Sequence, residues 1–520
     1  MAEYIYYRPE WTCGRYNKEA NVAIYYNLIE GMSYFFEDDS AEIIGWLLNI
    51  PRNSCFSVNI LSEETDTAIE CLIPFLAELV SCGLLTTAEI TQECIKNYRQ
   101  TLSHDKCSKS QTEVKTTKEK LPIAVSSAER EYMNRIAGVA SVMFELTYNC
   151  SEKCIHCYNI GATRNDTEVS KRNSREELTL DDYYRIIDEL NEQGLVKVCL
   201  SGGDPFSKPF VWEIIGYLYK KEIAFDIFTN GQKLSGQEER LANYYPRLVA
   251  VSIYSGDAAE HDYITRIGGS WAKSMNVVKE LSKLAVPLNL KCCIMRPNIK
   301  HYYQVANLAK KYGAVAQFEV SLADSIDGDK CVSHYLRLTP ELLEIVLRDD
   351  NVPLYVGAEA PNYGGQPKLM SDNACGAGYN TFCITPEGNL IPCCSFHAVF
   401  GNLKHDTFKQ ICQNSEDLHL WQSLTLSEYQ DCGKHEYCDY CNLCVGNNYS
   451  EHGNPTIAAE NNCYIAKVRH ELATKMKNGY DPLHGKSIFE TLNELQDYAK
   501  EKLKREYSQD YSDKRLMVGG

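Results

Sequence analysis

Three cysteines stand close together at Cys150, Cys154 and Cys157, and no other part of the first half of the chain offers such a set of ligands. The apolar run 139–146 precedes them and is strand-like, so the thiols should lie on the loop that leaves the C-terminal end of a strand. In parallel α/β folds, loops at this edge converge around a site. Three thiolates at this spacing can hold three irons of a 4Fe-4S cluster, and an iron that lacks a protein ligand can bind a small molecule. A zinc knuckle, a disulfide pair with a spare thiol and chance are the alternatives.

The spacing Cys-x3-Cys-x2-Cys resembles the cluster loop of the radical S-adenosylmethionine (SAM) enzymes, with His156 where that family carries an aromatic residue. The resemblance implies that a 4Fe-4S cluster at these thiols binds SAM. It also implies that Tyr158, next to the last cysteine, lines the adenine pocket.

Further motifs fall at later predicted strand ends. Gly202, Gly203 and Asp204 look like the GGE motif of the same family, with Asp204 in place of the acid that holds the methionine amine of SAM. A simple turn is the alternative. Ser252 resembles the serine that contacts the ribose. Arg266, in a segment similar to the HD...T/R...GSF segment of peptide-modifying members, is the residue implied to meet the SAM carboxylate, unless it is a surface arginine.

A second group of cysteines begins at Cys375, and the spacing from there through Gly388 to Cys393 is similar to the opening of the SPASM domain, an extension that carries auxiliary clusters. The segment 432–444 departs from that family's usual spacing. The resemblance implies two auxiliary 4Fe-4S clusters, with ligands as follows: Cys375, Cys383, Cys393 and Cys444 for one, and Cys432, Cys438, Cys441 and Cys463 for the other. Cys394 could exchange roles with Cys383, one iron could remain open to substrate, and zinc ribbons are the alternative.

Strands and helices alternate in the pattern between the two groups of cysteines, which predicts an α/β fold with a parallel, curved sheet. The predicted strands are 139–147, 196–201, 225–229, 248–254, 288–295 and 317–322, with helices such as 180–193 and 270–284 between them. Six such strands match the partial (β/α)6 TIM barrel of the radical SAM core, here over 135–325. A bridge at 326–370, the SPASM domain at 371–470 and a charged helical tail at 471–520 follow.

Residues 1–95 are predicted to form a separate unit, with a β-hairpin at 21–36 and helices at 38–48 and 63–82. This pattern is similar to the winged-helix, PqqD-like recognition element of ribosomally made, modified peptide (RiPP) pathways. The resemblance implies that the open edge of the hairpin pairs with the leader of a precursor peptide. A generic adaptor or a dimerisation module is the alternative. The polar residues of 96–134 predict a flexible linker.

Composition narrows the function further. A net charge of -17 over 520 residues argues against nucleic acid as a partner. No run of eighteen apolar residues and no secretion signal are present, which predicts a cytoplasmic protein without a membrane partner. In such a reducing compartment, the clustered members of the 23 cysteines indicate metal binding rather than disulfides.

The resemblances together imply an oxidoreductase that cleaves SAM to a 5'-deoxyadenosyl radical and uses it on a precursor peptide, with a flavodoxin- or ferredoxin-type electron donor. Thioether formation from a cysteine sulfur to carbon is the first hypothesis. Carbon-carbon or carbon-oxygen crosslinking, and less readily epimerisation, are alternatives. Oxidation of the sulfatase-maturase type is disfavoured because Cys394 stands where those enzymes carry an aspartate base. A non-enzymatic, metal-stabilised peptide-binding scaffold is the remaining alternative.

Overall fold

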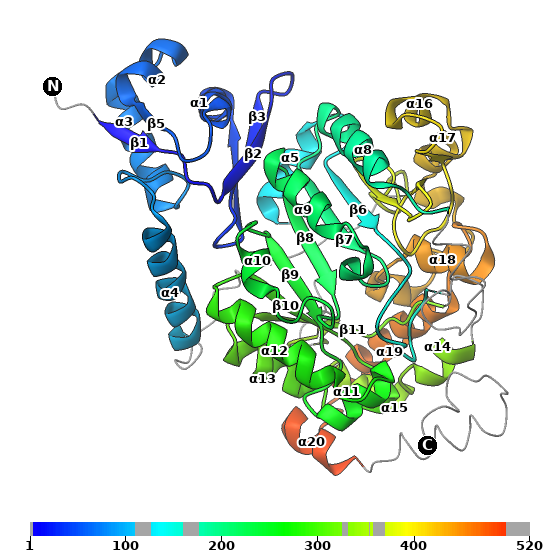
Figure 1. The fold of residues 1–520 in the computed structure, drawn as a ribbon. Coiled ribbons are helices and arrows are strands. Elements are labelled where there is room, and N and C mark those ends of the chain that lie inside the picture. The colour runs from blue at the N-terminus through cyan, green and yellow to red at the C-terminus, as the bar shows by residue number, and fades with distance from the viewer. Residues whose placement is uncertain are drawn as a thin grey trace.

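The computed structural model describes residues 4–109, 126–159, 176–324, 331–352, 354–356 and 370–495. The strands of its main sheet are β6 (Ser141–Glu145), β7 (Lys197–Ser201), β8 (Ala224–Thr229), β9 (Leu248–Ser252), β10 (Leu288–Cys293), β11 (Val315–Glu319), β12 (Thr381–Ile384), β13 (Asn389–Ile391) and β14 (Gly401–Asn402). Their order across the sheet is β11-β10-β9-β8-β7-β6-β12-β13-β14 (Figure 1). The six strands from β6 to β11 are parallel neighbours in chain order, which confirms the predicted layout.

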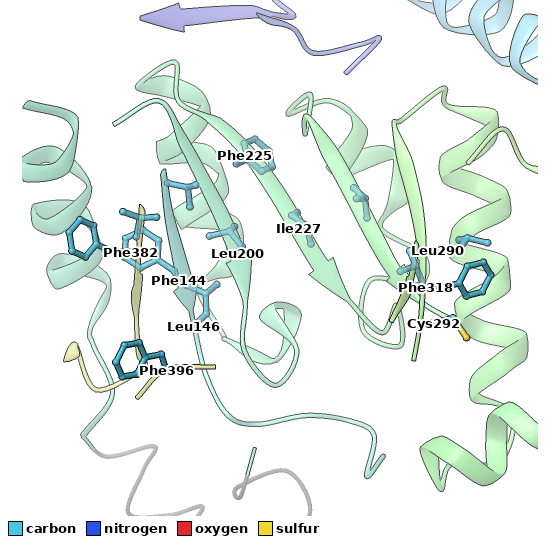
Figure 2. Close-up of a cluster of buried hydrophobic side chains, with 14 of the residues drawn as sticks. Phe144, Leu146, Leu200, Phe225, Ile227, Leu290, Cys292, Phe318, Phe382 and Phe396 are labelled. Carbon is cyan, nitrogen blue, oxygen red and sulfur yellow. The ribbon is translucent and has the colours of Figure 1, made fainter. Parts of the chain in front are cut away.

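Helices cover the outer face of this sheet. They are α8 (Leu180–Glu192), α9 (Val211–Lys220), α10 (Glu238–Ala242), α11 (Ala258–Thr265), α12 (Ser270–Lys283) and α13 (Tyr303–Lys311), with short 3-10 helices η1 (Pro205–Ser207) and η2 (Arg296–Asn298). The predicted helices 180–193 and 270–284 correspond to α8 and α12. Alternate strand residues form the core against these helices. Figure 2 shows Phe144, Leu200, Phe225, Ile227 and Leu290 in this cluster. The strand residues between these core positions point to the inside of the curved sheet.

Strand β12 joins the sheet next to β6, in a way that the sequence did not predict. Thr381 pairs with Ser141 and Ile384 with Phe144, in parallel, and β13 and β14 then extend the sheet in antiparallel fashion. Without β12, the strand β6 would be at the edge of the sheet with unpaired backbone groups. These groups pair instead with β12, which follows β6 by more than two hundred residues. Cys383 of the second group thus lies on a strand that pairs directly with β6, the strand that leads into the first group.

The N-terminal part contains β1 (Ile5–Tyr7), β2 (Thr12–Asn17), β3 (Val22–Asn27), β4 (Met32–Glu37), α1 (Asp38–Asn49), β5 (Cys55–Ser57), α2 (Val58–Thr65), α3 (Ile69–Ser81), α4 (Gln92–Lys109) and α5 (Ser127–Arg135). The antiparallel sheet β2-β3-β4 includes the predicted hairpin. The predicted helix 63–82 is wrong, because the chain breaks into α2 and α3. Asp66 ends α2 in a left-handed conformation, at φ 50°, and the second helix starts only after Ala68.

Apart from Ser126, the described residues of the segment predicted as a flexible linker, 96–134, are helical. Helix α4 runs into it from one side, and α5 forms its other end, while 110–125 lie outside the described residues. Tyr132 anchors α5 within this segment, and Ile95 anchors α4 just before it; both side chains are buried. Ser126 and Glu129 form a capping box that starts α5.

The N-terminal sheet packs against the end of the barrel where its strands begin. Its buried side chains, such as Ile24 and Tyr26, share a cluster with Val196 and Ala224, which lie at the start of β7 and β8. A buried ion pair joins Glu129 of α5 to Lys197, with 3.0 Å between Oε1 and Nζ. The N-terminal part is therefore fixed at the end of the barrel opposite the cysteine loop that follows β6.

The remaining helices are α14 (Cys331–Leu336), α15 (Pro340–Val346), α16 (Phe408–Asn414), α17 (Glu416–Ser423), α18 (Val445–His452), α19 (Glu460–Lys477) and α20 (Ile488–Glu494), with 3-10 helices η3 (Leu426–Glu428) and η4 (Glu436–Tyr440). The helical tail predicted from residue 471 is the end of α19 and α20, and 496–520 lie outside the described residues. In the part of the chain that the structure describes, no helix has the length and apolar character needed to cross a bilayer.

Candidate active site

The loop of Cys150, Cys154 and Cys157 leaves the C-terminal end of β6, as predicted, and rests on the end of α11. The backbone N–H of Lys153 donates to the carbonyl of Thr265 at 3.0 Å, and that of Ile155 donates to Ile264 at 2.9 Å. These two bonds hold the middle of the loop against the helix and bring it beside Arg266, the next residue after α11.

Gly202 and Gly203 lie directly against the segment that leads into this loop. The N–H of Gly203 donates to the carbonyl of Thr147 at 2.6 Å. A Cβ at Gly203 would lie 2.5 Å from the carbonyl oxygen of Asn149, and one at Gly202 would lie 2.4 Å from that of Thr147. Only glycine allows this approach, so the two residues position the start of the cysteine loop.

Asp204 is fully buried and bound by the neighbouring strand end. Its Oδ2 accepts hydrogen bonds from the hydroxyl of Thr229 at 2.6 Å and the N–H of Asn230 at 3.0 Å, and its Oδ1 accepts one from the N–H of Phe206 at 3.0 Å. Asn230 in turn points its amide at Cys150, with 3.2 Å between Nδ2 and Sγ. The structure thus shows Asp204 in a positioning role, and a contact with the SAM amine stays a prediction.

The donor set of the loop fits an iron-sulfur cluster. Burial raises the pKa of Cys150 to about 12 and that of Cys154 well above its usual range. Such thiols stay protonated unless a cation at the site stabilises their thiolates, which is what cluster iron does. The N–H of Glu152, 3.4 Å from the sulfur of Cys150, and the amide of Asn230 are donors of the kind that surround cluster sulfurs. When bound, a cluster of this kind would supply the electron that cleaves SAM.

The other residues predicted to contact SAM lie around this loop. Ser252 is half-buried at the end of β9, and Arg266 is half-buried in a left-handed conformation at φ 59°. His156 packs edge-on against Tyr254, with ring centroids 4.6 Å apart, and burial lowers the pKa of His156 to about 4. Tyr158 points its hydroxyl toward Glu145, 3.4 Å from Oε1. The SAM contacts of Ser252, Arg266 and Tyr158 stay predictions.

The second group of cysteines forms two sets of neighbours that meet at Cys441 and Cys444. Burial raises the pKa of Cys393, to which Cys394, Cys444 and Cys375 add, and burial raises that of Cys383, to which Cys394 and Cys393 add. Burial also raises the pKa of Cys432, Cys441 and Cys463, with a smaller contribution from neighbouring cysteines that include Cys438 and, for Cys441, also Cys444. Within the described ranges, no three or more His, Cys, Asp or Glu side chains are grouped so that they could hold a metal ion as they stand. The assignment of ligands to clusters therefore stays a prediction.

The inner face of the sheet carries polar residues that the sequence analysis did not single out. Glu145 at the end of β6 is fully buried, and burial raises its pKa to about 8. Cys394 and Lys291 interact electrostatically, as do Cys394 and Glu145. The signal that could have found them is the alternation of each strand, because Glu145 and Lys291 stand at inward positions between outward core residues.

Two family models match the chain. Residues 144–309 match the radical SAM superfamily, and residues 375–445 match SPASM, an iron-sulfur cluster-binding domain. The first match covers β6 to α13 with the cysteine loop, and the second covers the strands β12 to β14 with most of the later cysteines.

Curated relatives and solved structures agree with these matches. The subtilosin biosynthesis protein AlbA of Bacillus subtilis is 25% identical over 308 residues, which is 58% of this chain and 66% of AlbA. An AdoMet-dependent heme synthase of Methanosarcina barkeri is 25% identical over 325 residues, 59% of this chain and 90% of that protein. The structure of Streptococcus suis SuiB bound to SAM aligns with a TM-score of 0.50 at 13% identity, over 88% of this chain and 99% of SuiB.

The domain matches and the arrangement of the cysteine loop lead to the same conclusion. The chain carries a radical SAM domain followed by a SPASM domain, and it is an enzyme whose cofactors are 4Fe-4S clusters and SAM.

Proposed function

We propose that the protein modifies a ribosomally made precursor peptide, whose leader binds the N-terminal part, and that it forms a thioether between a cysteine sulfur and a carbon of that peptide. In this proposal, the reaction takes place in the cytoplasm and a flavodoxin- or ferredoxin-type protein donates the electrons. The involvement of the relative AlbA in the biosynthesis of a bacteriocin supports a peptide substrate. The heme synthase relative favours instead a substrate that is not a peptide.

The observation that carries the peptide hypothesis is the outer edge of β4. Among the described residues, β4 pairs with β3 alone, so its other edge offers backbone groups to an added strand. Over one face of this strand, Phe75 of α3 packs edge-on against Phe36, with ring centroids 6.1 Å apart and both rings half-buried. The N-terminal end of α5 contacts the strand through Ser126, whose hydroxyl oxygen lies 2.7 Å from that of Ser33. A leader strand would pair with the backbone of β4 beside these contacts.

The leader edge and the cysteine loop are held apart by the barrel. The turn before β4 contacts the end where the strands begin, since a Cβ at Gly31 would meet Pro287 at 3.0 Å. The cysteine loop lies at the other end, beyond the five residues of β6, a strand about 17 Å long. The precursor therefore needs a segment of at least several extended residues between its leader contact and its modified residue.

The chemistry of a thioether accounts for every electron. The substrate loses a hydrogen atom from carbon to the deoxyadenosyl radical and a proton from the cysteine thiol, and forming the S–C bond releases one more electron, which an auxiliary cluster can accept. Carbon-carbon or carbon-oxygen crosslinks share this balance. Epimerisation does not, because the hydrogen is returned.

One experiment tests the function as a whole. The protein is expressed with the short peptide encoded beside its gene, and the peptide is analysed by mass spectrometry after thiol alkylation. A thioether removes two hydrogen atoms and one alkylatable cysteine, whereas the other crosslinks remove the hydrogens but spare the thiol. Unchanged mass together with deuterium uptake from heavy water supports epimerisation and contradicts the thioether. A scaffold would release no 5'-deoxyadenosine with dithionite and SAM.

The leader edge has its own test. Amide hydrogen exchange is measured on the anaerobic holoenzyme with and without a synthetic leader of the same peptide. We expect the amides of β4 to exchange more slowly when the leader is present, whereas exchange in β2 should not change. Protection absent from β4 would contradict the docking edge while leaving the chemistry open to the first experiment.

A further inference from the structure

Successive side chains of β10 point alternately to the outer core and to the inside of the curved sheet. Its outward residues Leu288, Leu290 and Cys292 belong to the main core and are at most 2% exposed. Of the inward residues, Asn289 is buried, whereas Lys291 and Cys293, nearer the C-terminal end of the strand, are only half-buried. The inner side of β10 is therefore more open toward this end, and Lys291 is reached by solvent there.

The ammonium group of Lys291 rests on an aromatic ring. Its Nζ lies 3.2 Å from the ring centroid of Phe228 on β8, a cation–π contact. Burial lowers the pKa of Lys291, and the neighbouring Cys199, Cys394, Asp226 and Cys293 oppose this shift.

The nearby acid is already engaged. Asp226 holds Arg247, with 2.7 Å between Oδ1 and the guanidinium Nε. Among the described residues, no carboxylate oxygen lies within 4.0 Å of the Lys291 ammonium, although Lys197 and Lys208, the other lysines buried in the barrel, have such partners at 3.0 Å and 2.8 Å. A partly desolvated cation that lacks an acid is costly, and a bound anion would offset that cost.

The position of Lys291 connects the two ends of the candidate site. In the sheet register it lies beside Ser252 on β9, the residue implied to contact the ribose of SAM. It also interacts with Cys394, which the SPASM segment contributes. A group bound at Lys291 would thus lie near both the predicted SAM site and the SPASM segment, where a substrate residue has to lie.

We propose that Lys291 binds a carboxylate of the substrate peptide, an Asp or Glu side chain at or next to the modified residue. The inference rests on the proposed function and specifies its substrate. The same chemistry could come from the carboxylate of SAM, but Arg266 beside the cysteine loop is the residue implied for that group. An ammonium on a flexible stem over an aromatic ring suits a carboxylate that enters with the peptide.

The test is a cycle of paired substitutions on the reconstituted holoenzyme. The variants are Lys291→Gln, which removes the charge, and Lys291→Arg, which keeps it, with Lys279→Gln on the exposed side of α12 as the matched control. The probe is the peptide encoded beside the gene, together with versions in which each Asp or Glu of its core segment becomes Asn or Gln. Lys291→Gln is expected to lower kcat/KM about 10- to 100-fold, the loss typical of a charged hydrogen bond.

With the unchanged enzyme, one of the acid-to-amide peptides should be modified as slowly as the original peptide is by Lys291→Gln. Combining that peptide with Lys291→Gln should cause no further loss, because both changes remove the same interaction. Lys291→Arg should retain most activity. A second readout is the binding of the core segment alone to unreduced holoenzyme, followed by fluorescence anisotropy, which should weaken by a similar factor. Fully additive losses, or equal binding by Lys291→Gln and the unchanged enzyme, would overturn the inference.

The two sources of carboxylate are separated by SAM affinity. If Lys291→Gln weakens SAM binding tenfold or more while no acid-to-amide peptide matters, the carboxylate is that of SAM and the peptide assignment is wrong. If the unchanged enzyme does not modify the peptide, the proposed function is wrong, and the inference, which rests on it, is wrong as well. A peptide that is modified equally well by Lys291→Gln contradicts the inference alone.

Discussion

Cys393 and Cys394 follow one another in the chain, yet their thiols have different neighbours. Beside Cys394, the thiol of Cys393 interacts with Cys444 and Cys375. That of Cys394 interacts with Glu145 and Lys291 on the inner face of the barrel, and burial raises its pKa to about 11. Cys393 thus lies among the other SPASM cysteines, whereas Cys394, which also neighbours Cys383, lies in addition near polar residues of the inner face of the barrel.

This difference predicts opposite effects on iron content. Cys393→Ser should lose one cluster and reduce the iron of the anaerobically reconstituted protein from about twelve to about eight atoms per chain, at four irons per cluster. Cys394→Ser should keep all of the iron. Iron and sulfide analysis with electron paramagnetic resonance measures both. Equal iron loss in the two variants would show that Cys394 is a ligand, in exchange with Cys383.

Gly203→Ala should disrupt the first cluster without unfolding the barrel. Its Cβ would lie 2.5 Å and 2.7 Å from the carbonyl oxygens of Asn149 and Tyr148, so the segment leading into Cys150 has to shift. We expect 5'-deoxyadenosine formation with SAM and dithionite to fall at least about tenfold, the effect of a small misplacement at a reacting centre.

Gly216→Ala, in α9, is the control for this variant. A Cβ there would lie 3.7 Å from Tyr244, which is an ordinary van der Waals distance. The control variant should keep its iron and its SAM cleavage. Normal cleavage by Gly203→Ala would mean that the loop can move away from β7 at no cost, contrary to the contacts described.

Asn230 should tune the first cluster through its bond to Cys150. The amide N–H that points at the sulfur, 3.2 Å away, stabilises negative charge on the thiolate and favours the reduced cluster. Asn230→Leu should therefore shift the reduction potential to a more negative value, read by redox titration with electron paramagnetic resonance. Asn276→Leu on the exposed face of α12 should cause no shift, and a positive shift in Asn230→Leu would contradict the role.

The buried ion pair of Glu129 makes stability depend on pH. Burial alone raises the pKa of Glu129, but the charges of Arg247 and Lys197 outweigh burial and lower it. A carboxyl with a lowered pKa contributes stability that is fully present above its unfolded-state pKa, about 4.3, and is lost as pH falls through the lower folded-state value.

Glu129→Gln should therefore cost about 3 to 5 kcal/mol near neutral pH, because it removes the buried carboxylate that Lys197 contacts at 3.0 Å and one of the two acids beside Arg247. The cost should shrink in acid, where the unchanged protein also loses the charge. Urea unfolding at a series of pH values measures both. Glu131→Gln, an exposed change on the same helix, should cost less than about 1 kcal/mol at every pH, and a similar pH dependence there would refute the role of Glu129.

The parallel strands were predictable because each is a short apolar run that is followed by a helix, and both signals are local. The pairing of Thr381 with Ser141 was not, because no local pattern specifies which distant edge a short strand joins. The cysteine loop was identified from its spacing, from the strand-like run before it and from the resemblance to the radical SAM family. Lys291 was missed because its lack of an acid partner is a property of three-dimensional neighbours, which the sequence around it does not reveal.

The pairing of β12 with β6 has a consequence for any shortened form of the chain. A product that stops before residue 375 would keep the whole radical SAM core but expose the backbone of β6 along a bare sheet edge. Such an edge recruits other strands, so the product should form intermolecular sheets and precipitate rather than persist as a smaller enzyme. Partial translation or cleavage in this region should therefore yield a product that does not persist in solution.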